Sequence, residues 1–287
     1  METTIEQLAF VGFGEAATAF VSGWTQARPA RLTACDIRTD AEMRARYAKY
    51  GVSGTPVGAE ALAGAQAVFS VVTADQALIA AENAAPHLPA DTLWLDCNSC
   101  APKTKRRAAA AIEAAGGRYV DVAVMAPVYP KRHHVPLLIS GPHADVAATA
   151  LLSLDMKPKV AGTEIGQASS IKMIRSIMVK GLEALSAECF LAARSAGVED
   201  SVLASLAETD PAMAWPQRGA YSLERMMVHG LRRAAEMREV ASTVEDLGLG
   251  GGMSAASADW QERIGALGIE PGADDLFLRA DTLLARL

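Results

Sequence analysis

The stretch that decides the fold runs from residue 8 to residue 20, LAFVGFGEAATAF, where a short apolar run passes through two glycines into an alanine-rich segment. Gly12, Gly14 and Ala17 fit the pattern G-x-G-x-x-G/A, directly after a predicted strand and at the start of a predicted helix. The first glycine permits a tight turn, the second lets the backbone approach a pyrophosphate, and the small third residue allows close strand–helix packing. The alternative is a glycine-rich turn that serves packing alone.

The residues around this motif strengthen the prediction of a dinucleotide site, because amide groups at a helix start donate hydrogen bonds to phosphates. Asp36 ends the next predicted strand, RLTACD, where a carboxylate would accept hydrogen bonds from the adenosine ribose hydroxyls. A carboxylate there repels a 2′-phosphate, which favours NAD. Arg38 could pair with such a phosphate, so NADP stays possible. The expected phosphate-binding residues are Gly12, Phe13, Gly14, Glu15 and Ala16.

The first half of the chain alternates short apolar runs with alanine-rich helical segments, as in QLAFVGFG followed by EAATAFVSGWTQA. Strands separated by helices of this length predict βαβ units and a doubly wound sheet. After about Thr163 the apolar residues keep helical spacing, and no convincing strand pattern follows. We therefore expect an α/β protein with a Rossmann-like NAD(P)-binding domain, residues 1–162, and an all-helical substrate and dimerisation domain, residues 163–287, joined by a long interdomain helix.

The composition limits the class of partner. The chain has 287 residues, a formal net charge of -6 and a pI near 5.5, which give no electrostatic reason to expect nucleic acid or an anionic membrane. No segment approaches the roughly 18 apolar residues of a membrane span. The N-terminal METTIEQLAFVGFG also lacks a basic region followed by a long apolar stretch. We expect a cytoplasmic protein that binds a small molecule.

Four cysteines are too few for a disulfide framework in so long a chain, which fits a reducing compartment. Cys97 and Cys100 form C-x-x-C after a predicted strand, which is the setting of a redox pair. No second pair completes a zinc site, and nothing nearby suggests a thioredoxin-like unit, so we interpret the two as small residues in a turn. The run GLGGG at residues 248–252 follows a helix rather than a strand and is interpreted as a connection between helices.

The predicted interdomain helix contains GQASSIKMIRSIMVKGLEAL, residues 166–185. Its apolar residues recur at steps of three and four and mark one face; they are Ile171, Ile174, Met178, Leu182 and Leu185. Its polar residues fall on another side; they are Lys172, Ser176, Lys180 and Glu183. Spacing alone therefore predicts that Lys172 lies on the solvated face of the helix.

Four motifs resemble the β-hydroxyacid dehydrogenase superfamily, which includes 3-hydroxyisobutyrate and 6-phosphogluconate dehydrogenases. They are the glycine motif at Gly12, DCNS at 96–99, DVAVMAP at 121–127 and GQASSIKMIRS from Gly166. The phrases VMAPV and RRAAEM are similar to the branch whose C-terminal domain is of unknown function. The resemblance covers essentially the whole chain. It implies a nicotinamide-dependent oxidoreductase that forms a homodimer through its helical domain.

The resemblance also implies a catalytic role for Lys172, which matches the family's lysine on the interdomain helix beside the nicotinamide. It would donate a proton during carbonyl reduction or help to remove one during alcohol oxidation. An exposed lysine titrates at about 10.4, which is high for a base at neutral pH. Burial or a nearby positive charge would lower this pKa, and Arg175 and Lys180 are candidates for that charge.

Further residues are assigned by the same resemblance. The loop after the strand AVFSVVT would lie beneath the cofactor ribose; its residues are Val72, Thr73 and Ala74. Asn98 would approach the nicotinamide, and Ser99 the substrate. Many relatives hold the substrate carboxylate with Ser-Gly-Gly, where this chain has Met125, Ala126 and Pro127 without a hydroxyl. Ser176 stands where asparagine is common, and His229 and Gly230 replace a Lys-Asp pair, so Ser176 and His229 are candidate substrate contacts.

The altered pocket motif is followed by Lys131, Arg132, His133 and His134. Our hypothesis is that Lys131 or Arg132 replaces the lost grip on an acidic substrate; the alternative is a basic surface loop. Two adjacent histidines without a patterned carboxylate or cysteine are poor evidence for a metal, so we expect none.

Two classes of function remain open. The favoured class is an NAD(P)-dependent dehydrogenase or reductase acting on a hydroxy acid or related polyol or keto acid. An NADPH-dependent imine reductase is a close variant with a VMAP-like stretch, but its members usually replace the lysine, so Lys172 argues for carbonyl–alcohol chemistry. The second class is a non-catalytic dinucleotide-binding module such as a redox sensor, which would keep Gly12, Gly14 and Asp36 without needing Lys172.

Overall fold

The computed structural model describes residues 5–287; residues 1–4, part of the stretch in which no leader is expected, lie outside the described residues. The chain forms two compact units, one that ends at Met173 and one from Ile174 to Leu287. No helix of the described part of the chain is long and apolar enough to cross a membrane.

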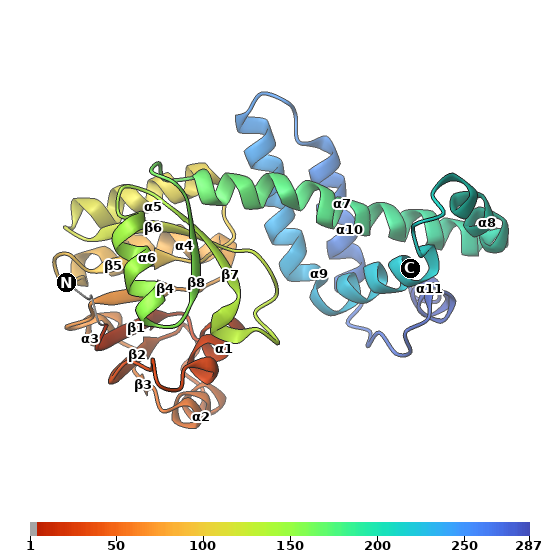
Figure 1. The fold of residues 1–287 in the computed structure, drawn as a ribbon. Helices are drawn as coiled ribbons and strands as arrows, with labels where there is room; N and C mark the ends of the chain where they lie inside the picture. The colour runs from red at the N-terminus through yellow and green to blue at the C-terminus, as the bar shows by residue number, and fades with distance from the viewer. Residues whose placement is uncertain (1–4) are drawn as a thin grey trace. The chain divides into compact units, whose positions relative to one another are not determined.

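The first unit is built on an eight-stranded sheet in the order β3-β2-β1-β4-β5-β6-β7-β8 (Figure 1). Neighbouring strands are parallel except β6 and β7, which are antiparallel. The predicted doubly wound sheet is confirmed. Its strands are β1 (Gln7–Val11), β2 (Arg31–Cys35), β3 (Ser53–Gly54), β4 (Ala67–Ser70), β5 (Leu93–Asp96), β6 (Arg118–Val124), β7 (Pro136–Ser140) and β8 (Lys157–Gly162).

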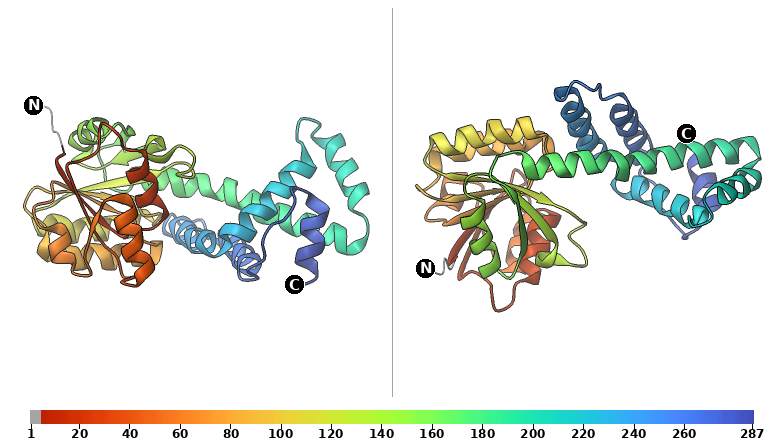
Figure 2. Two further views of the ribbon diagram at one scale, coloured as in Figure 1. Left: turned by 90° about the horizontal axis from the view of Figure 1, so that it is seen from below. Right: turned by 45° about the horizontal axis from the view of Figure 1, so that its top comes forward.

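Helices cover both faces of this sheet (Figures 1 and 2). Successive strand residues point to opposite faces, so Phe10 joins a core with α1, α2 and α6, while Ala9 joins a second core with α3, α4 and α5. The helices are α1 (Glu15–Gly23), α2 (Ala41–Tyr50), α3 (Gly58–Leu62), α4 (Ala77–Ala84), α5 (Pro102–Ala114) and α6 (Ala144–Ser153). Three short 3₁₀ helices are η1 (Ala74–Gln76), η2 (Ala85–His87) and η3 (Arg132–His134).

The second unit contains no strand among its residues, as predicted for the C-terminal part of the chain (Figure 2). Helix α7 (Gln167–Ala196) begins in the first unit and continues into the second. The other helices are α8 (Glu199–Thr209), α9 (Trp215–Asp246), α10 (Gly252–Gly265) and α11 (Leu276–Leu284). The glycine run lies between α9 and α10 except for its last residue, Gly252, which begins α10, so the run is a connection between helices as predicted.

The long helix α7 buries the polar face that spacing predicts to be solvated and exposes much of its apolar face. Ser176, Lys180 and Glu183 are only 5%, 5% and 1% exposed. Met178 and Leu185 from the apolar stripe are 63% and 58% exposed. The reversal has a physical cause, because the two buried charges, Lys180 and Glu183, are paired with residues of α9, and Ser176 accepts from Lys180.

These pairs join α7 to α9 and α10 inside the second unit. Lys180 Nζ lies 2.7 Å from Glu236 Oε2. Arg233 donates to both oxygens of Glu183, and Gln261 Nε2 donates to Glu183 at 3.0 Å. All five side chains are buried or nearly so, which makes an ionic layer part of this unit's core.

Candidate functional site: a dinucleotide turn and a paired lysine

The glycine turn has the geometry of a phosphate-binding loop. Gly12 has a φ of +86°, and a Cβ there would lie 2.8 Å from the carbonyl oxygen of Val71 and 2.9 Å from the Val72 side chain, so only glycine fits. Gly14 precedes α1, and a Cβ at Gly14 would meet nothing within 4 Å. No side chain caps this helix start. The first amides of α1 therefore face open space where a pyrophosphate can approach.

Asp36 lies beside this turn, as predicted. Its Oδ2 accepts from the amide of Phe13 at 2.7 Å, and its Oδ1 accepts from the amide of Arg38 at 2.9 Å. The guanidinium of Arg38 is held by Asp40 at 3.0 Å and by Glu42 at 2.8 Å. The positive charge that could attract a 2′-phosphate is thus paired with two carboxylates.

The loop expected beneath the ribose follows β4. Val72 packs its side chain over Gly12, Thr73 is exposed, and Ala74 begins η1. Because β1 and β4 are adjacent parallel strands, this loop and the glycine turn leave the sheet at the same edge. The carboxyl ends of strands in such a sheet form the ligand crevice.

Lys172 reaches the next loop along this edge. Its Nζ donates to the Oγ of Ser99 at 2.6 Å, and the lysine is half-buried rather than solvated. The prediction from spacing that Lys172 lies on a solvated face is therefore wrong. The start of α7 lies against the sheet edge, which brings an amine from residue 172 to a loop 73 residues earlier.

Asn98 is 4% exposed. Its Nδ2 donates to Ser70 Oγ at 2.9 Å and to Asp96 Oδ1 at 2.7 Å. Its own Oδ1 is buried and has no partner among the described residues. An unpaired buried oxygen costs free energy, and a cofactor amide would satisfy it.

The segment expected to hold substrate continues from β6. The amide of Met125 donates to the carbonyl of Pro136 at 2.9 Å, so Met125 extends the β6–β7 ladder. Met125 and Ala126 are half-buried and Pro127 is exposed. None of the three side chains carries a hydrogen-bonding group, so any grip on a carboxylate here would come from the backbone.

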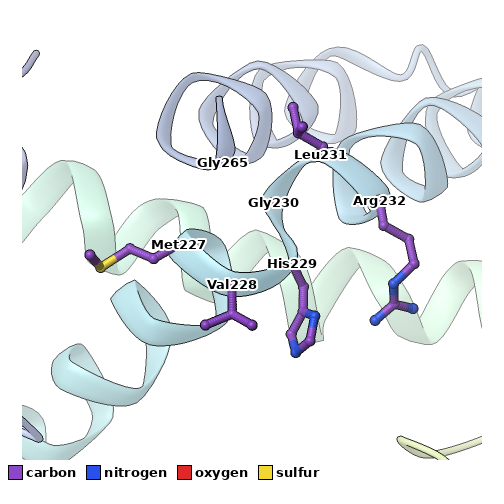
Figure 3. Close-up of a pocket in the computed structure, with 7 residues that line it drawn as sticks. All are labelled: Met227, Val228, His229, Gly230, Leu231, Arg232 and Gly265. Atoms are coloured by element: carbon purple, nitrogen blue, oxygen red, sulfur yellow. The ribbon is translucent and has the colours of Figure 1, made fainter. Parts of the chain in front are cut away.

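Ser176 and His229 belong to the second unit, and their roles toward a substrate stay predictions. Ser176 Oγ accepts from Lys180 at 3.4 Å. His229 lines a pocket of about 270 Å³ on α9 and α10, where it projects on the same side of α9 as Arg232 while Leu231 points the other way (Figure 3). Burial, together with Arg225, Arg232 and Arg233, lowers the pKa of His229 to about 4. A neutral imidazole at pH 7 is a poor proton donor.

Gly230, beside His229, has a packing reason to be glycine. A Cβ there would lie 2.7 Å from the Cα of Gly265, where α9 and α10 cross with backbones in close approach. A larger side chain at this position would not fit this crossing.

Cys97 and Cys100 are buried, and neither forms a disulfide. Burial raises the pKa of the Cys97 thiol to about 12. Since the thiolate is the reactive form, this environment opposes redox exchange.

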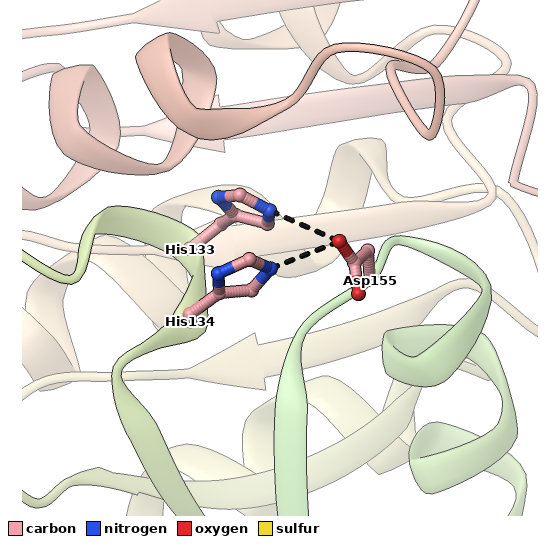
Figure 4. Close-up of side chains that lie close together, drawn as sticks. All are labelled: His133, His134 and Asp155. Carbon is pink, nitrogen blue, oxygen red and sulfur yellow. Dashed lines mark hydrogen bonds and ion pairs between the residues drawn. The ribbon is translucent and has the colours of Figure 1, made fainter.

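Two histidines and a carboxylate lie together where η3 and the segment before β8 meet (Figure 4). His134 Nε2 lies 2.9 Å and His133 Nε2 3.5 Å from the same oxygen of Asp155. The three ligand atoms lie within 4.8 Å of one another, but Lys157 donates to the other oxygen of Asp155 at 3.0 Å. A cation at that distance opposes a second one, so the cluster fits a hydrogen-bonded contact between two loops better than a metal site.

The basic loop itself packs against α1. Arg132 donates to the carbonyl of Ser22 at 3.4 Å, and His133 lies against Gly23. Both contacts are at the C-terminal end of α1, about 13 Å along the helix from Gly14. These contacts describe where Arg132 lies and do not test substrate binding, so a grip of Lys131 or Arg132 on an acidic substrate stays a hypothesis.

Together the sheet order, the glycine turn and Asp36 define a Rossmann-type dinucleotide-binding protein. Residues 7–152 match the NAD binding domain of 6-phosphogluconate dehydrogenase, and residues 193–264 match a domain of unknown function (DUF1932). The first match spans just over half of the chain. The chain belongs to this family, and the resemblance predicted from the motifs is confirmed.

Solved structures extend this finding. A conserved hypothetical protein from Sinorhizobium meliloti 1021 is 38% identical, with a TM-score of 0.77 over 100% of this chain and 98% of that chain. A 3-hydroxyisobutyrate dehydrogenase from Mycobacterium tuberculosis is 16% identical, with a TM-score of 0.74 over 97% and 99%. An imine reductase from Myxococcus stipitatus is 19% identical, with a TM-score of 0.55 over 97% and 99%. At these identities, the last two show a shared fold alone.

Proposed function

We propose that this protein is an oxidoreductase that transfers a hydride between NAD and a hydroxy acid or a related polyol or keto acid, with Lys172 as the proton-transfer group. The observation that carries the proposal is the 2.6 Å contact between Lys172 Nζ and Ser99 Oγ. In this contact the amine of Lys172, from α7, lies against the loop after β5, at the carboxyl edge of the sheet. Family membership adds an NAD-binding domain, residues 7–152, which includes this loop.

Bound NAD would supply the hydride acceptor or donor at its nicotinamide ring. Lys172 would donate a hydrogen bond to the substrate oxygen and transfer a proton to it as the carbonyl is reduced. In the oxidative direction, the neutral amine of Lys172 would take the proton from the alcohol. Ser99, which accepts a hydrogen bond from Lys172, would orient the ammonium toward the substrate. After the product leaves, the Oγ of Ser99 would again accept the hydrogen bond that Lys172 had donated to the substrate oxygen.

NAD fits the residues at the turn better than NADP. The open space at Gly14 would admit the pyrophosphate, and the unpaired Oδ1 of Asn98 would accept from the carboxamide. The carboxylate of Asp36 would bind ribose hydroxyls and repel a 2′-phosphate, while Arg38 is engaged by Asp40 and Glu42. Fluorescence titration with NADH and NADPH tests this preference. Tighter binding of NADPH by the wild-type protein would contradict this preference. In Asp36→Ala, the difference between the affinities for NADH and NADPH should become smaller.

The experiment for the reaction follows reduced-nicotinamide absorbance with hydroxy acids, sugar acids, their keto forms and cyclic imines. Wild type is compared with Lys172→Ala and with Lys159→Ala, which removes an exposed lysine from β8. We expect turnover of a hydroxy or keto acid that only Lys172→Ala loses, with cofactor binding retained. Reduction of cyclic imines alone would favour the imine reductase. Cofactor binding without any turnover would favour the binding module.

We also propose a homodimer that covers the apolar stripe of α7. Ile174, Met178 and Leu185 are 49%, 63% and 58% exposed. A row of large apolar side chains along one helix marks an interaction surface. The helical domain would therefore form the dimer interface. It would also bind substrate, through Ser176 and His229.

A further inference from the structure

A cluster of ionic side chains lies beneath the carboxyl edge of the sheet, in the first unit. Asp96 ends β5, Asp121 stands opposite it on β6 in register, and Lys105 comes from α5. Their exposed fractions are 1%, 0% and 1%. Lys105 Nζ donates to the carbonyl of Asp96 at 2.6 Å and to its Oδ1 at 3.0 Å, and lies 3.5 Å from Asp121 Oδ1.

The ammonium of Lys105 is charged in this setting. Burial alone would lower its pKa, but the attraction of Asp96 and Asp121 outweighs burial and raises the pKa above its ordinary value. Tyr119 adds a hydrogen bond from its hydroxyl to Asp96 Oδ2 at 2.7 Å. The two carboxylates therefore share one cation, and Asp96 also accepts a hydrogen bond from a fixed hydroxyl.

Each carboxylate also reaches one part of the candidate site. Asp96 Oδ1 accepts from the amide of Asn98 at 3.0 Å and from its Nδ2 at 2.7 Å, which holds the loop that carries Ser99. Asp121 Oδ2 accepts from the amide of Ser169 at 2.9 Å, in the first turn of α7. A carboxylate at a helix start satisfies a free amide and complements the helix dipole.

Ser140 completes the attachment of α7. Its Oγ accepts from the amide of Ala168 at 3.0 Å and donates to Asp121 Oδ2 at 3.4 Å. Lys172 follows Ser169 by three residues, so it lies less than one helical turn from the anchored amide. The orientation of that turn decides where the ammonium of Lys172 points.

We propose that the Lys105–Asp96–Asp121 cluster is the positioning device of the site, because it fixes the Ser99 loop and the first turn of α7 against each other and thereby sets the contact between Lys172 and Ser99. The three residues act through Lys172, Ser99 and Asn98 and touch no substrate themselves. The inference rests on the proposed function for its effect on turnover. Its effect on the position of Lys172 is independent of that function.

The test uses two sets of variants of the full chain. Lys105→Met keeps the volume of the stem and removes the charge, and Arg107→Met, from an exposed position on the same helix, is the matched control. Asp121→Leu removes the acceptor for the Ser169 amide, while Asp121→Asn keeps an oxygen there. Thermal unfolding identifies the variants that fold. Should Lys105→Met fail to fold, the Asp121 pair decides the matter.

The first readout needs no substrate: reductive methylation followed by peptide mapping measures the labelling of Lys172 relative to the other lysines. We expect Lys105→Met and Asp121→Leu to increase the relative labelling of Lys172, because its ammonium leaves Ser99 for solvent, and Asp121→Asn to stay closer to wild type. With a substrate in hand, the first two should lose about 10- to 100-fold in kcat with little change in KM, as expected for a proton donor displaced by about 1 Å.

The outcomes separate the two proposals. Relative labelling of Lys172 as in Arg107→Met, with thermal stability alone reduced, would show that the cluster is only a structural ion group and would overturn the inference. Altered labelling in Lys105→Met, together with full turnover in Lys172→Ala, would support the positioning of Lys172 and overturn its proposed catalytic role.

Discussion

Alanine substitutions at the two glycines of the turn should have opposite effects on folding and on cofactor binding. Gly12→Ala forces a side chain into a φ of +86°, which costs about 1–2 kcal/mol. Its Cβ would also lie 2.8 Å from the Val71 carbonyl, and overpacking adds about 1–3 kcal/mol. At about 2–4 °C per kcal/mol, we expect Tm to fall by at least about 4 °C.

Gly14→Ala meets no neighbour within 4 Å, so the fold should tolerate it. Loss of glycine before α1 costs under about 1 kcal/mol, or about 1–3 °C in Tm. Its methyl group would instead occupy the space in front of the α1 amides. Loss of one charge-assisted hydrogen bond to a phosphate, about 1.5–3 kcal/mol, would weaken NADH binding by about 10- to 100-fold.

Differential scanning fluorimetry and NADH fluorescence titration, run on both variants, measure the two effects. Wild-type affinity for NADH in Gly14→Ala would refute the assignment of this space to the pyrophosphate. An unchanged Tm in Gly12→Ala would refute the steric argument for the turn.

Three further predictions concern the second unit. Gly230→Ala should destabilise this unit by about 1–3 kcal/mol, because the Cβ would press on the backbone of α10. The control Gly252→Ala, at the open start of α10, should leave Tm unchanged or higher. Calorimetry of the two variants measures both effects. His229, whose pKa is lowered to about 4, binds its proton more readily in the unfolded chain, so stability should rise with pH from about 4 to about 6.5. Urea titrations across that range should show a shallower rise in His229→Gln, and an equal rise would contradict the pKa assignment. Met178→Glu and Leu185→Glu should each yield a monomer in sedimentation equilibrium, because a charge on the exposed stripe opposes apolar contact; a dimer that persists in both would place the interface elsewhere.

The central strands are predictable because their local signal is strong. β1, β4 and β5 are short apolar runs buried between two helical layers, and the helices between them are alanine-rich. β8 is not predicted from the sequence, because KPKVAG lies at the edge of the sheet and is exposed or half-buried throughout. An edge strand of this kind has neither a continuous apolar run nor a clean alternation. β3 is only two residues long and leaves no pattern at all.

The candidate site divides in the same way. The glycine turn and Asp36 are local motifs and can be read from spacing. The role of Lys105 cannot, because a lysine in PKTKRR resembles any solvated helical lysine, and its partners lie on β5 and β6. The contact between His134 and Asp155 is likewise not predictable from spacing, because 21 residues separate them in the sequence. Only the pairing of strands and the packing of α5 on the sheet bring such groups together.

Helix α7 shows why amphipathic spacing alone could not decide the surroundings of Lys172. Periodicity separates an apolar face from a polar face, but the choice of buried face depends on the partners of each. Lys180 and Glu183 can be buried because Glu236 and Arg233 on α9 supply opposite charges. The apolar stripe can stay exposed in one chain if a second chain covers it. The polar side chains of α7 are therefore buried at Ser176, Lys180 and Glu183. Lys172, near the start of the helix, is half-buried, and the anchored first turn directs its amine to Ser99.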